Sequence, residues 1–181
     1  MSSIKSPGPK QNYDGTGLRI AIVHARWNDR VIQSLIAGAK RELLLAGVKE
    51  EDISFESVPG SYELPFAVQM ILKKSGRRGD IIHAEGRPFD VVITIGALIK
   101  GDTMHFEYIS NAVSDGLMRA QLDQEVPVIF GILTLLTEQQ GLERAGLSAK
   151  GHNHGEDWGR AAVELGVKNR NWTARSHTGS L

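Results

Sequence analysis

The chain contains no cysteine among its 181 residues. This absence excludes a disulfide framework, a thiolate nucleophile and any zinc or iron–sulfur site that needs cysteine ligands. An excess of charge of either sign is also missing, since 21 Lys and Arg balance 21 Asp and Glu. We therefore expect no nucleic-acid partner, although a local phosphate site is compatible with a neutral chain.

Long hydrophobic runs are absent as well. The longest, residues 126–136 with the polar Thr134 inside it, is far too short to span a bilayer. Residues 1–17 carry neither the apolar core of a secretory signal nor the arginine pattern of an import sequence, and they are rich in Ser, Pro, Gly and Lys. We expect a flexible arm there, no membrane partner and a cytoplasmic location.

The rest of the sequence alternates between short apolar runs and amphipathic segments, with 41% hydrophobic and 23% charged residues overall. The last two apolar runs have almost no polar residues, which is typical of parallel strands covered by helices on both faces. We predict a flavodoxin-like, three-layer α/β/α sandwich of the doubly wound kind, with a central parallel sheet of about four strands. The predicted strands are 18–23, 53–58, 89–95 and 126–133, and the predicted helices are one between Asn28 and Gly47, then 64–74, 106–122, 137–146 and 156–169.

Domain boundaries follow from the composition. We predict one folded domain over residues 18–172 and a flexible tail over 173–181. Within the domain, residues 75–88 are polar and rich in Gly and Arg, which predicts an inserted surface loop between a helix and a strand. Asn28 carries the signal of a side-chain cap for the first helix, and Gly47 stands where a helix-ending glycine belongs.

Unusual residues collect at one predicted edge of the sheet. Open parallel sheets bind ligands beyond the carboxyl ends of their strands. Aromatic, ionisable and glycine residues follow those ends, whereas the opposite connections at 47–52 and 124–125 are plain polar turns. We therefore predict one pocket at the carboxyl edge, built from residues 24–28, 59–63, 96–105 and Thr134.

Most of these residues also have a purely structural interpretation. Trp27 is either a packed side chain or a flat surface on which a heterocycle stacks. The turn at Gly60 either only reverses the chain or also exposes the amides of Ser61 and Tyr62 to a ligand. Glu63 either favours a helix N-terminus or accepts hydrogen bonds from a polyol.

The segment 100–105 has the chemistry of a phosphate site. Gly101, Asp102 and Thr103 precede a predicted helix, where free N–H groups and a hydroxyl favour an anion, and Lys100 adds positive charge. His105 then lies close enough to exchange protons with a ligand held there. The alternative is a capped helix with an incidental surface histidine.

Two histidines, His152 and His154, raise the question of a metal site. The i, i+4 spacing usual for helical ligands is missing, so we expect no metal. The letters His-Asn-His also match a nuclease motif, but a neutral chain argues against nucleic-acid cleavage.

Five phrases of the sequence together are similar to lumazine synthases, the family that makes 6,7-dimethyl-8-ribityllumazine in riboflavin biosynthesis. The similarity runs from about Leu18 to Asn169. It implies a transferase that needs no cofactor and condenses 5-amino-6-(D-ribitylamino)uracil with 3,4-dihydroxy-2-butanone 4-phosphate, releasing phosphate and water. The phrases occur in the family's order at 27–28, 58–65, 96–107, 127–134 and 143–146.

The resemblance also implies a role for each matching residue. His105 is implied as the general acid and base, because imidazole takes and gives protons near neutral pH. Arg144 is implied in phosphate binding, and His154 is a further candidate where bacterial relatives often have lysine. The implied pyrimidine and ribityl contacts are Trp27, Asn28, Ser61, Tyr62, Glu63, Leu98, Ile99, Lys100 and Phe130, and the implied phosphate contacts are Gly101, Asp102, Thr103 and Arg144.

Assembly is implied in the same way. Relatives form homopentamers, some of which build sixty-subunit shells, with active sites between subunits and the residue matching Arg144 contributed by the neighbour. The connection 145–155 is longer here than in shell-forming relatives, which favours a free pentamer. The rival hypotheses are a non-catalytic lumazine- or riboflavin-binding protein of the same fold and a generic phosphosugar- or nucleotide-binding protein. The second rival is weakened because no glycine-rich phosphate loop is present.

Overall fold

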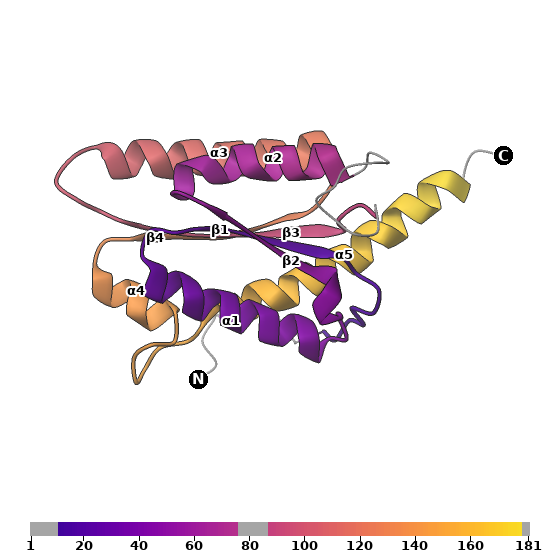
Figure 1. Cartoon of the computed structure of the whole chain (residues 1–181), viewed down its shortest axis with the longest axis horizontal. Coiled ribbons are helices and arrows are strands. Elements are labelled where there is room, and N and C mark those ends of the chain that lie inside the picture. The colour runs from indigo at the N-terminus through magenta and orange to yellow at the C-terminus, as the bar shows by residue number, and fades with distance from the viewer. Residues whose placement is uncertain (1–10, 76–86, 179–181) are drawn as a thin grey trace, which may run out of the picture.

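The computed structural model describes residues 11–75 and 87–178. Its four strands form one parallel sheet in the order β2-β1-β3-β4, with helices on both faces (Figure 1). The predicted three-layer sandwich is therefore confirmed. The elements are β1 (Ile20–Ala25), α1 (Asp29–Leu45), β2 (Ile53–Val58), α2 (Leu64–Ser75), β3 (Val91–Ile99), α3 (His105–Gln124), β4 (Val128–Leu135), α4 (Glu138–Arg144) and α5 (His154–Thr178), with short 3₁₀ helices η1 (Glu50–Asp52) and η2 (Ser61–Glu63).

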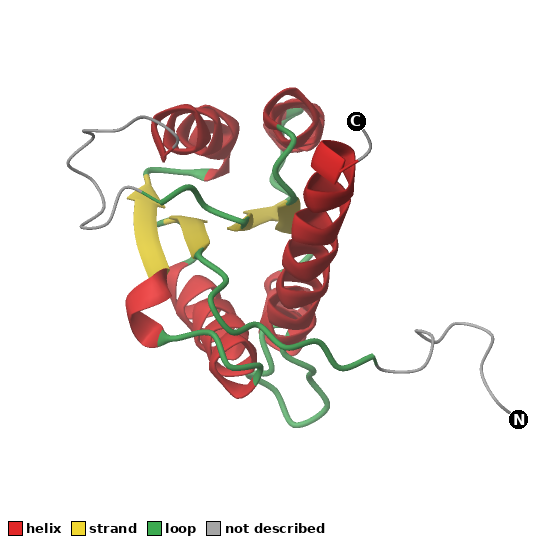
Figure 2. Ribbon diagram, turned by 90° about the vertical axis from the view of Figure 1, so that its right-hand side faces the viewer, coloured by secondary structure: helices red, strands yellow, loops and turns green. Residues whose placement is uncertain are grey.

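Alternation along the strands divides the interior into two apolar layers. On β1, Ile20 and Ile22 pack toward α1 and α5, whereas Ala21 and Val23 pack toward α2 and α3. Side chains of a strand point alternately to the two faces, so a strand buried on both faces must be apolar throughout. Figure 2 shows the same arrangement from the side, with the strands between the two sets of helices.

Two strands, β3 and β4, continue further at the carboxyl edge than predicted. Strand β3 continues to Ile99, although Gly96 suggested an exit loop after residue 95. Strand β4 continues through Thr134 to Leu135. The extensions stabilise each other, since Gly96 pairs with Ile132 and Ile99 pairs with Leu135. Hydrogen bonding between strands therefore outweighs the local preference of glycine for a turn.

The two ends of the chain also differ from the prediction. Gly15 lies within the segment expected to be a flexible arm, yet its N–H donates to Ala46 O at 2.7 Å and the residue is buried. Helix α5 begins at His154 and runs to Thr178, through residues predicted as a tail, and its last turns project beyond the sheet (Figure 1). The predicted loop 75–88 falls mostly on residues 76–86, which lie outside the described residues.

The first helix is capped differently from the prediction. Gly47 has φ 91°, the left-handed conformation expected of a glycine that ends a helix. Asn28 precedes α1 but makes no side-chain capping bond. Its Nδ2 instead donates to Ala97 O on β3 at 2.9 Å. The side chain therefore joins the end of β1 to β3.

An ionic network joins β1, β3 and α5 at the amino edge of the sheet. The Asp90 carboxylate accepts the Arg19 N–H at 2.7 Å and two guanidinium bonds from Arg170, both at 2.6 Å. Asp90 is only 16% exposed, so water competes weakly for these bonds.

We expect Asp90→Asn to lower the free energy of unfolding by about 1–2 kcal/mol, because it removes the charge from these hydrogen bonds. Denaturant unfolding monitored by circular dichroism measures this change. Glu164→Gln on α5, which removes an exposed pair with Lys168, is the control and should change stability by less than about 0.5 kcal/mol. Equal stability of Asp90→Asn and the control would contradict the role given to Asp90.

Within residues 11–75 and 87–178, no helix combines the length and apolar composition that a membrane span requires.

Candidate active site

A cavity of about 640 Å³ lies at the carboxyl edge of the sheet. The strand order reverses between β1 and β3, and the ends of these two strands supply part of its wall. This is the position at which doubly wound sheets bind ligands. The residues that line the cavity are Trp27, Asn28, Pro59, Gly60, Ser61, Tyr62, Glu63, Ala97, Leu98, Ile99, His105, Ile109 and Glu138.

Two aromatic side chains stand at this cavity with most of their surface exposed. Trp27, directly after β1, is 73% exposed, and Tyr62 in η2 is 60% exposed. Exposure of an indole to this degree rules out the interpretation of Trp27 as a packed core residue. A Cβ at Gly60 would lie 3.5 Å from Trp27 Cδ1, so the indole lies directly beside the turn. The arrangement leaves a flat apolar surface for a planar ligand.

The floor of the cavity depends on close packing between β3 and η2. Ser61 is buried, and its Oγ lies 2.6 Å from where a Cβ on Gly96 would stand. Side chains of Leu64 and Ile132 would lie 3.1 Å from the same position. Only glycine permits this approach, which explains a glycine inside a buried strand.

The Glu63 carboxylate binds the backbone at the start of η2 and still has an oxygen that can accept a hydrogen bond from a polyol. Its Oε2 accepts the Gly60 N–H at 2.8 Å, which satisfies a backbone donor at the start of η2. The carboxylate also lines the cavity. With Oε2 engaged, Oε1 is the oxygen that can accept a hydrogen bond from a ligand.

His105 is the first residue of α3 and lines the cavity. Its backbone N–H donates to Thr103 Oγ1 at 3.4 Å. Gly101, Asp102 and Thr103 are exposed just outside the cavity lining, between β3 and α3. A Cβ at Gly101 would meet no atom within 4 Å, so packing gives no reason for glycine there. Close approach of a ligand to the backbone does give a reason.

Lys100 is placed differently from the other predicted residues of this segment. Its ammonium pairs with the Glu107 carboxylate and lies 5.9 Å from the centre of the Phe106 ring. The hydrogen bond from Lys100 lowers the pKa of the Glu107 carboxyl. In this arrangement Lys100 does not line the cavity, and its charge is balanced by α3.

Besides Lys100 and the segment 101–103, three further predicted site residues do not line the cavity of their own chain. Phe130 on β4 is 45% exposed and is not part of the lining. Arg144 ends α4, at the opposite end of that helix from Glu138, which does line the cavity. His154 begins α5, and burial is the main cause that lowers its pKa, with smaller contributions from His152 and Arg144.

The prediction missed two lining residues, Glu138 and Ile109. Glu138 follows β4 in the first turn of α4. The rule that located the pocket also applied to the end of the fourth strand, so the signal for Glu138 was present. Ile109 lies one helical turn after His105 on α3, a spacing that places both side chains on one face. The carboxylate and imidazole side chains that line this cavity are those of Glu63, His105 and Glu138.

The histidines do not form a metal centre in the part of the chain that the structure describes. No group of three or more His, Cys, Asp or Glu side chains there has the geometry to hold a metal ion. His152 and His154 instead share a carboxylate oxygen of Asp157.

The fold and the cavity together define a doubly wound α/β protein with a cavity at the switch point of its parallel sheet, the position at which this class of protein binds small molecules. A model of the family 6,7-dimethyl-8-ribityllumazine synthase matches residues 17–170. A protein of that name from Pyricularia oryzae is 51% identical over 194 residues, which cover 94% of this chain and 96% of the relative. The namesake from Schizosaccharomyces pombe is 52% identical over 169 residues, covering 93% and 98%. The namesake from Leifsonia xyli is 41% identical over 167 residues, covering 92% and 96%.

The chain belongs to the 6,7-dimethyl-8-ribityllumazine synthase family. The resemblance predicted from the five sequence phrases is thereby confirmed.

Proposed function

We propose that this chain is a transferase that condenses 5-amino-6-(D-ribitylamino)uracil with 3,4-dihydroxy-2-butanone 4-phosphate to form 6,7-dimethyl-8-ribityllumazine. The observation that carries the proposal is the convergence of Trp27, Glu63 and His105 on one cavity. A planar ring, a polyol chain and a proton-transfer step each need one of these side chains. The membership of the chain in this family supports the same reaction.

The residues of the cavity divide the work of binding. The exposed face of Trp27 stacks on the pyrimidine, since aromatic rings pair well with flat heterocycles. The ribityl hydroxyls bind the free oxygen of Glu63 and backbone groups of Ser61 and Tyr62. Asn28, Leu98 and Ile99 complete the wall against β3.

The reaction needs proton transfer from nitrogen and to oxygen. The 5-amino group attacks the ketone carbon, and the resulting carbinolamine loses water to give an imine. Loss of the proton at C3 expels phosphate from C4, and the resulting enol takes up a proton at C4 and becomes a ketone. The ribitylamino nitrogen attacks this ketone, and closure of the second ring releases another water. His105 accepts the proton that the amine loses and donates a proton to each departing hydroxyl, while the cavity holds the two substrates together.

The phosphate group binds at the start of α3. Gly101, Asp102 and Thr103 lie exposed next to the first turn of a 20-residue helix, where N–H groups and the helix dipole favour an anion. Because Arg144 does not line the cavity of its own chain, a neighbouring subunit supplies it, together with Phe130 and His154. The Arg144 fork then completes the phosphate site.

This arrangement requires an oligomer, and we propose a homopentamer that works in the cytoplasm. Large exposed apolar side chains support contact between subunits, because such groups are costly to leave in water. The expected mass in analytical ultracentrifugation is five times the 19.8 kDa of one chain. The mass of a monomer would contradict a site shared between subunits. The mass of a sixty-subunit particle would contradict only the proposal of a free pentamer. The exposed apolar residues on α2, α3 and β4 are Phe66, Tyr108, Met118, Leu122 and Phe130.

The activity is tested by mixing the two substrates with the purified protein and following lumazine fluorescence. A rise that depends on both substrates and continues in excess chelator supports the proposal. Binding of lumazine or riboflavin without turnover would support the rival hypothesis of a non-catalytic binding protein of the same fold.

We expect Trp27→Ala to weaken binding of the ribitylamino-pyrimidine by about tenfold, because one aromatic stacking surface is lost. Trp27→Phe keeps a ring at this position and should retain most of the affinity. Isothermal titration calorimetry with the pyrimidine substrate compares the two variants. Equal affinities of wild type, Trp27→Phe and Trp27→Ala would show that the indole does not contact the ring.

A further inference from the structure

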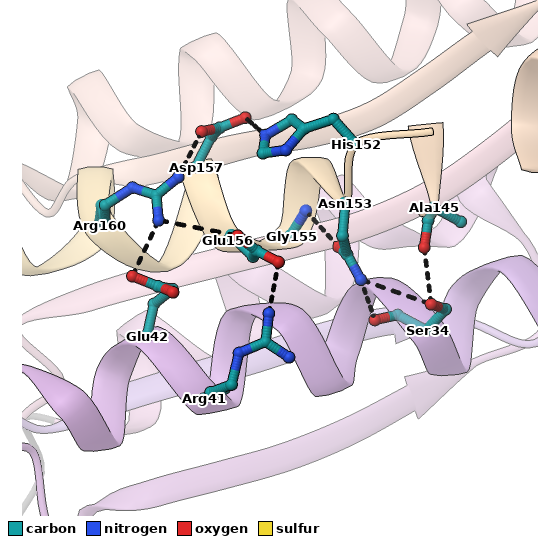
Figure 3. Close-up of polar contacts among 10 residues, drawn as sticks. All are labelled: Ser34, Arg41, Glu42, Ala145, His152, Asn153, Gly155, Glu156, Asp157 and Arg160. Atoms are coloured by element: carbon teal, nitrogen blue, oxygen red, sulfur yellow. Dashed lines mark hydrogen bonds and ion pairs between the residues drawn. The ribbon is translucent and has the colours of Figure 1, made fainter. Parts of the chain in front are cut away.

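Two histidines, His152 and His154, meet the Asp157 carboxylate at the start of α5. Figure 3 shows the contact that His152 makes. His152 Nε2 lies 2.6 Å from Asp157 Oδ2, a hydrogen-bonding distance. His154 Nδ1 lies 3.6 Å from the same oxygen, close enough for an ion pair. The two rings pack edge to face, with centroids 5.3 Å apart. The histidines therefore compete for a single acceptor.

The carboxylate that they share is held from its other side. Arg160 Nη2 donates to Asp157 Oδ1 at 2.6 Å, and Arg160 Nη1 lies 2.8 Å from Glu42 Oε2 on α1. Glu156 adds a second link between the helices, since it pairs with Arg41 of α1 (Figure 3). This ladder of charges joins α1 to α5 and holds Oδ2 at a defined position.

The backbone beside the histidines is held as firmly. Asn153 Nδ2 donates to Ser34 O at 2.8 Å, and Asn153 Oδ1 accepts the Gly155 N–H at 2.9 Å. A Cβ at Gly155 would lie 2.0 Å from Leu35 O, so the start of α5 touches the α1 backbone. The backbone that carries His152 and His154 is therefore fixed against α1.

We propose that Asp157 is a positioning residue for His154: it holds Nδ1 toward the carboxylate, so that Nε2 is the nitrogen that meets a ligand, and His152 weakens this hold by competing for Oδ2. The inference rests on the proposed function, in which His154 and Arg144 meet the phosphorylated substrate in a neighbour's cavity. Asp157 itself touches no substrate in this arrangement.

The chemistry of imidazole gives this contact a direct consequence. A carboxylate beside one ring nitrogen favours the neutral tautomer with its hydrogen on that nitrogen, so Asp157 favours the proton of His154 on Nδ1 and the lone pair on Nε2. Such a ring accepts a hydrogen bond from a substrate hydroxyl or a protonated phosphate oxygen. On protonation Nε2 becomes a donor to phosphate.

The charged groups around His154 act in opposite directions. Burial lowers the pKa of His154 most strongly, and the Asp157 charge opposes this by raising it. Positive charge on His152, just before α5, and on Arg144, at the end of α4, lowers the pKa of His154 further. Loss of the Asp157 charge should therefore lower the pKa of His154, and loss of His152 should raise it.

The test uses the full chain labelled with ¹³C and ¹⁵N in histidine, in its native assembly. Ring chemical shifts report the pKa and the tautomer of each histidine. In Asp157→Asn we expect a lower pKa of His154 and a shift of its neutral proton from Nδ1 toward Nε2. In His152→Gln we expect the opposite change in pKa, with the proton kept on Nδ1. Glu164→Gln, a carboxylate removed elsewhere on α5, should change neither property.

Kinetics then separate positioning from folding. In Asp157→Asn we expect KM for the phosphorylated ketose to rise about three- to tenfold, the value of one neutral hydrogen bond, with kcat nearly unchanged. An unchanged pKa and tautomer of His154 in Asp157→Asn would overturn the inference, whatever the activity. If Asp157→Asn does not fold, His152→Gln decides, because an unchanged pKa of His154 there would also overturn it. Absence of lumazine synthesis by the wild type would contradict the proposed function and leave the ring measurements valid.

Discussion

Replacing His105 by alanine is expected to lower kcat by about 10²- to 10⁴-fold, the usual contribution of one general acid–base group. The imidazole is at the start of α3 and lines the cavity, beside the segment assigned to phosphate. Removing it leaves proton transfer to water, so each step that loses or gains a proton becomes slower. Single-turnover measurements of lumazine fluorescence check the chemical step directly.

Turnover of His105→Ala should nevertheless remain measurable. Trp27, Glu63 and the phosphate segment still hold the two substrates side by side, and placement alone accelerates a bimolecular condensation. Binding of the pyrimidine should be nearly unchanged, which titration of the variant shows. A kcat within a factor of about two of wild type would remove His105 from the acid–base role.

A control variant distinguishes the ring from the helix start that it occupies. His105→Gln keeps a polar side chain of similar reach at the first position of α3 but cannot transfer protons near neutral pH. It should be impaired nearly as much as His105→Ala. Recovery of most of the activity in His105→Gln would mean that the residue orients substrate by hydrogen bonding alone.

The architecture and the position of the site were predictable because both follow from local patterns. Apolar runs with almost no polar residues indicate parallel strands buried on both faces, and the carboxyl ends of such strands meet at one edge. That argument placed Trp27, Glu63 and His105 at a common edge, and all three line one cavity. Each of these side chains follows the end of its own strand by only a few residues.

The errors concern features that depend on distant partners. Asn28 was predicted to cap a helix, whereas its side chain binds Ala97 O, 69 positions along the chain. Gly96 was predicted to end a strand, whereas pairing with Ile132 on β4 continues it. Neither of these contacts leaves a periodic signal in the sequence.

The sequence pattern alone does not separate residues that act within one chain from residues that act between chains, and only the family resemblance implies that Arg144 comes from a neighbour. Arg144 and Glu138 lie on the same short helix, but only Glu138 lines the cavity of its own chain. A residue that matches the family's phosphate ligand and is exposed outside the cavity fits a role in a neighbouring subunit. This division leads to a quantitative test of the shared site.

Arg144→Ala is expected to raise KM for the ketose phosphate by about 10- to 100-fold, because two charge-assisted hydrogen bonds to phosphate are lost. KM for the pyrimidine should remain close to that of wild type. Arg144→Lys keeps the charge without the planar fork and should recover only part of the loss. Lys150→Ala removes an exposed cation from the connection between α4 and α5 and should leave both KM values unchanged. A similar rise of KM for the ketose phosphate in Lys150→Ala would show that the loss in Arg144→Ala comes from the change in net charge and not from a direct contact of Arg144 with phosphate.

Mixed oligomers test whether Arg144 acts in the neighbour's cavity. When His105→Ala and Arg144→Ala chains are unfolded together and reassembled in equal amounts, a shared site combines an intact His105 from one chain with an intact Arg144 from the next. Random arrangement makes about one quarter of such sites complete, so activity should rise well above that of either variant alone. If both residues served the same chain, every site in the mixture would lack one of them, and mixing would restore nothing. The degree of recovery therefore decides between a site shared across a subunit interface and one contained in a single chain.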